Sequence, residues 1–194
     1  VGGGGRISIT QLQTMAANGW STHSHTRTHE NLVAVTEAEA RTAIELNMAW
    51  LKQYGLHASG DKCLVLPFGN NSVAVENIVD DYYEYSAVAA EGATSTWDGI
   101  PDTKLIFRLN HDVPASSATI IAAINTVVSE GRSLVLYGHN VNTGTPGGTY
   151  TAMSTLTPII DHVYNLVRAG LVDNVNLQTF VKGRGVNGAR RSRY

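Results

Sequence analysis

Apolar and polar positions along the chain follow two alternating patterns, one typical of helices and one typical of strands. Amphipathic stretches with helix-start residues predict helices over 8–18, 36–55, 73–82, 118–129 and 155–169. Short β-branched or continuously apolar stretches predict strands over 20–25, 62–66, 85–89, 104–109 and 133–137, with a last strand or turn over 172–177. Helices that alternate with apolar strands favour a parallel α/β layer or barrel.

Local signals set the boundaries of these elements. Ser8 with Gln11, and Thr36 with Glu39, have the spacing of a capping box, in which side chain and backbone bond reciprocally. Pro158 is expected in the first turn of the last helix, where its missing N–H leaves no bond unmade. Residues 92–102 and 142–151 are predicted to be loops.

Three of the seven histidines, His23, His25 and His29, fall within seven residues. On a strand over 20–25, His23 and His25 point to the same face. If the chain turns helically after His25, the imidazoles of His25 and His29 meet closely enough to share a divalent ion. Such pairs also arise by chance, so a metal site and a chance pairing remain alternatives at this point.

Polar or loop-forming residues stand at the ends of four predicted strands: His25, Pro67-Phe68-Gly69, Arg108 and His139. In parallel α/β folds the chemistry lies at the carboxyl ends of the strands. We therefore expect His139 to open onto the same cleft as His25 and His29.

Composition narrows the classes of function. The 194 residues are 43% hydrophobic and 15% charged, which is typical of a single folded domain. A net charge of −2 gives no electrostatic case for nucleic acid or a membrane surface. The apolar runs are all shorter than a membrane span requires.

The segment GWSTHSHTRTHENL, residues 19–32, resembles the His-[Ser/Thr]-x-x-His motif of the polysaccharide deacetylases, carbohydrate esterase family 4 or NodB-homology domain. In that family two histidines and an aspartate from an earlier segment hold a divalent metal. The resemblance therefore implies His25 and His29 as metal ligands, with Zn²⁺ as the expected ion. It also implies a partial, distorted (β/α) barrel over residues 1–182, followed by a flexible basic tail over 183–194.

Two further stretches resemble motifs of the same family. Leu66-Pro67-Phe68-Gly69 is similar to the third motif, which implies that the Phe68 N–H helps to hold the oxyanion. Residues 134–139 are similar to the fifth motif, which implies that His139 is the general acid. An ordinary Pro-x-Gly turn and a capped strand-end histidine are the alternatives that the residues alone leave open.

The chain also departs from the family pattern. The first motif, which carries the catalytic base and the third metal ligand, is not found before the histidines, and the fourth motif is not recognisable. Arg108 is a candidate partner for a carboxylate. We expect the N-terminal strands to be missing from this chain, an upstream segment or second chain to supply an aspartate, and little acetate release by residues 1–194 alone.

The resemblance implies metal-dependent removal of N- or O-acetyl groups from a surface or cell-wall polysaccharide. It further implies an extracellular, cell-envelope or virion-surface location. The alternative is a catalytically inactive carbohydrate-binding or structural module of a larger surface assembly, with the same fold and an incomplete metal site.

Overall fold

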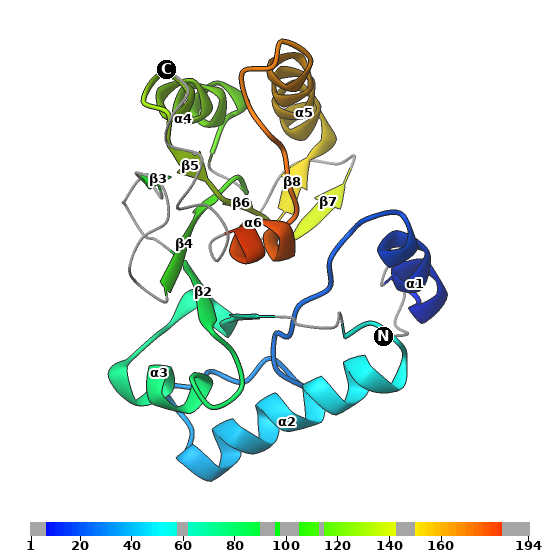
Figure 1. The fold of residues 1–194 in the computed structure, drawn as a ribbon, viewed down its shortest axis with the longest axis vertical. Coiled ribbons are helices and arrows are strands. Elements are labelled where there is room, and N and C mark those ends of the chain that lie inside the picture. Colours follow the sequence, from blue (N-terminus) through cyan, green and yellow to red (C-terminus); the bar gives the residue numbers. More distant parts are fainter. Residues whose placement is uncertain are drawn as a thin grey trace. The chain divides into compact units, whose positions relative to one another are not determined.

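The computed structural model describes residues 7–57, 62–89, 96–97, 105–112, 115–142 and 150–183. The chain divides into two compact units (Figure 1). Unit 1 comprises Val1–Val88 and Val175–Tyr194, and unit 2 comprises Ala89–Asn174. Residues 184–194, most of the predicted basic tail, lie outside the described residues.

Unit 1 combines helices with a parallel strand pair. Its elements are α1 (Ile9–Ala17), α2 (Glu37–Gln53), β1 (Cys63–Val65), the 3₁₀ turn η1 (Pro67–Gly69), α3 (Val73–Val79), β2 (Tyr85–Ala89, whose last residue belongs to unit 2) and α6 (Leu177–Gly183). β1 and β2 are parallel, with Leu64 opposite Ser86. Both predicted capping boxes are present, at Ser8 and at Thr36.

The core of unit 1 lies on one stripe of α2 and along β1. Ala40, Ile44 and Leu51 of α2 are buried, as their helical spacing predicts. Cys63 and Leu64 of β1 are fully buried as well. The strand that leads to Phe68 is therefore a rigid support for the turn that follows it.

Unit 2 holds the remaining elements. These are β3 (Thr96–Trp97), β4 (Leu105–Asn110), α4 (Ser117–Ser129), β5 (Ser133–Leu134), β6 (Leu136–Tyr137), β7 (Asn140–Asn142), β8 (Tyr150–Ala152) and α5 (Met153–Arg168). β4 pairs with β6 and β7 with β8, both in parallel, whereas β3 pairs with β5 antiparallel. Parallel pairing in both units confirms the predicted α/β class.

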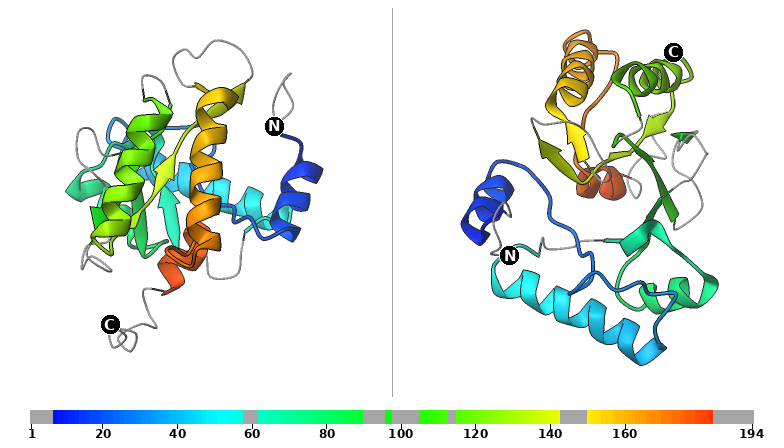
Figure 2. Two further views of the ribbon diagram at one scale, coloured as in Figure 1. Left: turned by 90° about the horizontal axis from the view of Figure 1, so that it is seen from above. Right: turned by 180° about the vertical axis from the view of Figure 1, so that it is seen from behind.

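α4 and α5 lie side by side in all three views (Figures 1 and 2). Ile120 and Ile124 of α4 and Ile159 of α5 form the buried cluster between them. Leu109 of β4 and Leu136 of β6 pack against that cluster. The two parallel strands are thus held by the helices, and their carboxyl ends deliver Asp112 and His139.

The predicted strand over 20–25 is wrong. It is reduced to a single parallel bridge between Ser24 and Leu64. Side chains take the bonds that a ladder would use: the Thr22 hydroxyl donates to the Leu56 carbonyl, and the Ser24 hydroxyl donates to Asn47 Oδ1 at 2.7 Å. These bonds reach 34 and 23 residues along the chain, so tertiary contacts rather than a regular sheet ladder hold the segment.

The predicted strand over 133–137 is interrupted. Its first half, β5, pairs antiparallel with β3 and its second half, β6, pairs parallel with β4. A strand that changes partner at Val135 is half-buried rather than continuously buried. The pairing of β7 with β8, formed within and beside a predicted loop, was not predicted.

The end of the chain differs from the prediction in two places. α5 begins at Met153, so Pro158 lies inside the helix and not in its first turn. Residues 172–176 form no strand, and α6 starts at Leu177, where the Asn176 side chain accepts from the Thr179 N–H at 2.8 Å. None of the described helices combines the length and apolarity that crossing a bilayer requires.

Candidate functional site

The segment before the paired histidines is anchored from two sides. The Ser24 carbonyl accepts from the Val65 N–H at 2.9 Å, which ties the segment to β1. On the other side, Asn47 Oδ1 of α2 accepts from the Ser24 hydroxyl at 2.7 Å and from the His25 N–H at 3.3 Å. Asn47 was not predicted from the sequence, since a single amide on a helix gives no pattern.

The imidazoles of His25 and His29 converge, as predicted. Their ring centroids are 4.8 Å apart and the ring planes meet at 74°. The predicted helical turn between them is wrong, because Thr26 and His29 have left-handed backbones with φ of 62° and 67°. Strained conformations of non-glycine residues are concentrated where function requires them.

Glu30 holds this turn closed. Its carboxylate accepts from the N–H of Thr28 at 3.1 Å and from the Thr28 hydroxyl, and its own N–H donates to Thr26 Oγ1 at 3.0 Å. Burial raises the pKa of Glu30, but the hydrogen bonds from Thr28 and Thr26 outweigh it and lower the pKa to about 2. We call residues 24–30 the histidine loop.

Phe68 stands beside the histidine loop on the η1 turn. Its backbone has φ of 59°, the residue is 60% exposed, and its ring centroid lies 4.6 Å from that of His29. Pro67 directly before it is buried, so the turn is fixed at its base. His25, His29 and Phe68 are thus brought together in unit 1.

The donor set of the histidine loop fits a divalent ion in part. His25 Nδ1 lies 2.7 Å from the Val65 carbonyl, an acceptor, so Nδ1 carries the hydrogen and Nε2 is the nitrogen with a lone pair. A second bond of this kind orients metal-binding histidines. Within the described residues, no three His, Cys, Asp or Glu side chains gather in a group that could hold a metal.

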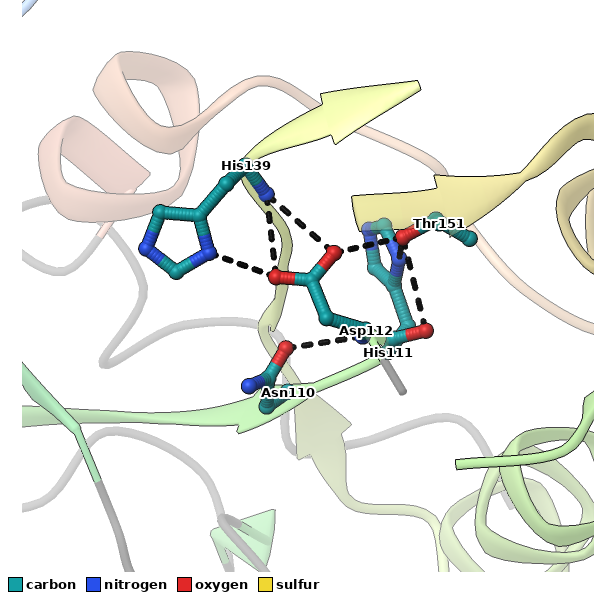
Figure 3. A network of polar contacts seen from close by, with 5 residues as sticks. All are labelled: Asn110, His111, Asp112, His139 and Thr151. Atoms are coloured by element: carbon teal, nitrogen blue, oxygen red, sulfur yellow. Dashed lines mark hydrogen bonds and ion pairs between the residues drawn. The ribbon is translucent and has the colours of Figure 1, made fainter. Parts of the chain in front are cut away.

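A second cluster forms in unit 2 around Asp112, which is only 2% exposed (Figure 3). Asp112 Oδ2 accepts from His139 Nδ1 at 2.5 Å and from the His139 N–H at 3.2 Å. Asp112 Oδ1 accepts from the Thr151 hydroxyl at 2.6 Å, and the hydroxyl oxygen of Thr151 lies 2.9 Å from His111 Nδ1. We call Asn110, His111, Asp112, His139 and Thr151 the Asp112 cluster.

The Asp112 carboxyl is ionised in this setting. Burial alone would raise the pKa of Asp112, but the bonds from Thr151 and His139 hold that pKa below its usual value. Burial lowers the pKa of His111, so that ring is held neutral. The side chain of His139 itself is 48% exposed.

Sequence reasoning missed Asp112 and Thr151. Asp112 follows β4, so the strand-end rule that selected His139 could have selected it too. Arg108, the candidate partner of a carboxylate, lies with its guanidinium 4.5 Å from the centre of the Tyr137 ring. That His139 shares a cleft with His25 and His29 stays a prediction.

Comparison with known proteins addresses the family. Residues 6–85, which include His25, His29 and Phe68, match the family model for polysaccharide deacetylase. The structure resembles a family 4 carbohydrate esterase from Streptomyces lividans solved in complex with acetate, with a TM-score of 0.51 and 15% identity. That match covers 84% of this chain and 68% of the other. A search of curated proteins finds no match.

The two findings agree with the motifs. The structural likeness establishes the fold and nothing more. The match to the family model covers the segment that contains the histidine loop and the η1 turn. The resemblance predicted from the sequence is confirmed: residues 6–85 match the polysaccharide deacetylase family, and the chain has the α/β fold of a family 4 carbohydrate esterase.

Proposed function

We propose that this protein is a metal-dependent deacetylase that hydrolyses N- or O-acetyl groups of a surface or cell-wall polysaccharide. The observation that carries the proposal is the convergence of the His25 and His29 rings, 4.8 Å apart, beside the exposed Phe68 turn. In this proposal His25 and His29 bind the metal, with Zn²⁺ as the expected ion. A bound divalent ion supplies a Lewis acid that polarises water and the acetyl carbonyl.

The residues around His25 prepare it as a ligand. The Val65 carbonyl fixes the tautomer in which Nε2 carries the lone pair, and Asn47 fixes the backbone of the same residue. A ligand held by rigid neighbours loses little conformational entropy when it binds an ion. The left-handed turn held by Glu30 does the same for His29.

Phe68 and His139 have separate tasks in the proposal. As water adds to the acetyl carbon, negative charge develops on the carbonyl oxygen, and the Phe68 N–H would donate to it from a fixed turn. When the C–N or C–O bond breaks, His139 in its imidazolium form gives its Nε2 proton to the leaving amine or alcohol and keeps its Nδ1 proton. Asp112 supports that step because its bond to Nδ1 fixes the orientation of the His139 ring, so that Nε2 points away from Asp112.

The general base is assigned to an aspartate outside residues 1–194. Catalytic zinc has three protein ligands in most enzymes, and the histidine loop supplies two imidazoles. We propose that an upstream segment or a second chain contributes this carboxylate. An acetylated polysaccharide as substrate also favours an extracellular, cell-envelope or virion-surface location.

Acetate release by the intact protein, together with the upstream segment or second chain that carries the aspartate, tests the proposal. The zinc-loaded protein is incubated with acetylated chito-oligosaccharides and with acetylated xylan, which present N-acetyl and O-acetyl groups. We expect release from one of the two, its loss on chelation, and its return when zinc is added. Binding of the glycans with no acetate release under any of these conditions would support the inactive carbohydrate-binding alternative.

A further inference from the structure

Thr151 has no task in the deacetylase proposal, although it lies at the centre of the Asp112 cluster. It sits on β8 and is only 1% exposed. Its hydroxyl contacts two side chains at once, Asp112 at 2.6 Å and His111 at 2.9 Å (Figure 3). A buried hydroxyl between two ionisable groups is a costly arrangement unless its hydrogen bonds are satisfied.

The direction of these bonds follows from counting hydrogens. The Thr151 hydroxyl has one hydrogen to give, and the ionised carboxylate of Asp112 can only accept. The hydroxyl therefore donates to Asp112 Oδ1 and accepts from His111 Nδ1. The third neighbour of the hydroxyl, the His111 carbonyl, is farther away at 3.5 Å. The result is a directed chain from His111 through Thr151 to Asp112.

The two oxygens of Asp112 are divided between Thr151 and His139. Among side chains, Oδ1 accepts from Thr151 and Oδ2 faces His139 Nδ1 at 2.5 Å, while the His139 backbone N–H lies 3.3 Å from Oδ1 and 3.2 Å from Oδ2. Rotation of the carboxylate would exchange these partners. Thr151 opposes that rotation because its short bond to Oδ1 holds one oxygen in place.

Backbone shape also keeps His111 beside Thr151. The His111 ring lies against Gly138, where an added Cβ would be 2.3 Å from Cε1 of the ring. Only glycine leaves this space directly before His139. Gly138, directly before the proposed acid His139, therefore leaves room for the ring of His111, which contacts Thr151.

We propose that Thr151 is a positioning residue for His139: it fixes the rotation of the Asp112 carboxylate and thereby the Nδ1–H tautomer of the His139 ring. His111, seated on Gly138, holds the Thr151 hydroxyl in the orientation that donates to Asp112. The catalytic meaning of this arrangement rests on the proposed acid role of His139, but the arrangement itself does not.

Two variants of one residue test the proposal. Thr151→Val removes the hydroxyl at nearly constant shape, and Thr151→Ser keeps the hydroxyl and removes only the methyl group. Ring ¹⁵N chemical shifts of His139 report its tautomer directly. We expect a single Nδ1–H tautomer in the wild type and in Thr151→Ser, and a mixture of tautomers in Thr151→Val. His111→Ala, whose Thr151 keeps its hydroxyl, should give a smaller shift in the same direction.

Acetate release separates this inference from the deacetylase proposal. With an active wild type, Thr151→Val should lower kcat by about 10-fold or more with little change in KM, as the loss of an orienting partner does. If the wild type releases no acetate and the tautomer still changes, positioning by Thr151 stands and the function proposed above fails. If Thr151→Val leaves the His139 ring shifts unchanged, or if Thr151→Ser behaves like Thr151→Val, the inference is overturned. Should Thr151→Val not fold, His111→Ala decides, and unchanged ring shifts there overturn the inference.

Discussion

The histidine loop of unit 1 and the Asp112 cluster of unit 2 hold their imidazoles with opposite kinds of partner. His25 donates from Nδ1 to a neutral backbone carbonyl, that of Val65, at 2.7 Å. His139 donates from Nδ1 to the buried, ionised Asp112 at 2.5 Å. A neutral acceptor suits a ring that binds a metal, whereas a carboxylate suits a ring that carries a proton to a leaving group.

The two regions also differ in the sequence range of the contacts that hold them in place. The histidine loop depends on left-handed backbones at Thr26 and His29, closed by side chains two to four residues away. The Asp112 cluster depends on contacts across 27 and 39 residues of the chain, between His139, Asp112 and Thr151. The first is a strained local turn, and the second is a network that exists only when β4, β6 and β8 are in place.

The largest expected effect is on zinc binding, and it should separate the two regions. His25→Ala removes one of two imidazoles, so we expect zinc affinity to fall by about 10²-fold or more, beyond the 10–100-fold cost of losing an orienting partner. His139→Ala should leave zinc affinity unchanged, since Asp112 and not the ion holds that ring. Isothermal titration calorimetry measures both, and an equal loss in the two variants would contradict the division of roles.

Gly138→Ala should disrupt the Asp112 cluster and leave the histidine loop unchanged. The added methyl group would lie 2.3 Å from the His111 ring, so the ring must move and its bond to Thr151 is lost. We expect unit 2 to be destabilised by about 1–3 kcal/mol in chemical unfolding. The matched control is Gly138→Ala in a His111→Ala background, where the clash has no partner. A cost that persists there would refute the explanation.

Asn47→Ala should loosen the histidine loop and leave the Asp112 cluster unchanged. It leaves the buried Ser24 hydroxyl and the His25 N–H without the acceptor Asn47 Oδ1. We expect a loss of about 1–3 kcal/mol in stability, the cost of leaving a buried hydrogen-bonding group without its partner, and weaker zinc binding. Asn47→Asp keeps an acceptor in the same position and should lose less; if the two variants behave alike, the hydrogen bonds are not what anchors the segment.

Acidification should give the smallest effect and should reach the two regions in sequence. Burial lowers the pKa of His111 below 6.5, so the unfolded chain binds more protons and unit 2 loses stability as pH falls from about 6.5. The pKa of Asp112 is also lowered, so its contribution is present above 3.8 and is lost below it. The contribution of Glu30 to unit 1 should be lost only between pH 4.5 and about 2.

NMR signals of the two units during an acid titration measure this order. His111→Ala should remove the early change in unit 2, and Glu30→Gln should remove the late change in unit 1. Because Glu30 is partly solvated, the late change should be modest. Early loss in unit 1, before any change in unit 2, would contradict the account.

Local signals in the sequence predicted most of the elements and half of the candidate site. Capping boxes at Ser8 and Thr36 and the apolar stripe of α2 are short-range patterns, so they could be read directly. The convergence of His25 and His29 was predicted too, although through a helical turn that the left-handed backbones replace.

Long-range features could not be predicted in the same way. Asn47 and Thr151 each bond to two residues, which lie 22 to 40 positions away in the sequence, and no spacing rule identifies such partners. The strand expected over 20–25 failed because its side chains bond to α2 and to the Leu56 carbonyl instead of joining a ladder. Residues 92–95, 98–102 and 143–149 lie outside the described residues, so the loops predicted there stay predictions, whereas Thr96–Trp97 within the first of these loops forms β3.

The proposed function requires that the histidine loop and the Asp112 cluster serve one reaction. Zinc-dependent acetate release, measured for the intact protein and for His25→Ala, His139→Ala and the double variant, tests it most directly. Each single variant should lower kcat/KM by about 10²-fold or more. The loss in the double variant should be much smaller than the product of the two single losses, because the effects of residues that act as a unit are not additive. Wild-type release rates in either single variant, or losses that multiply in full, would contradict the claim.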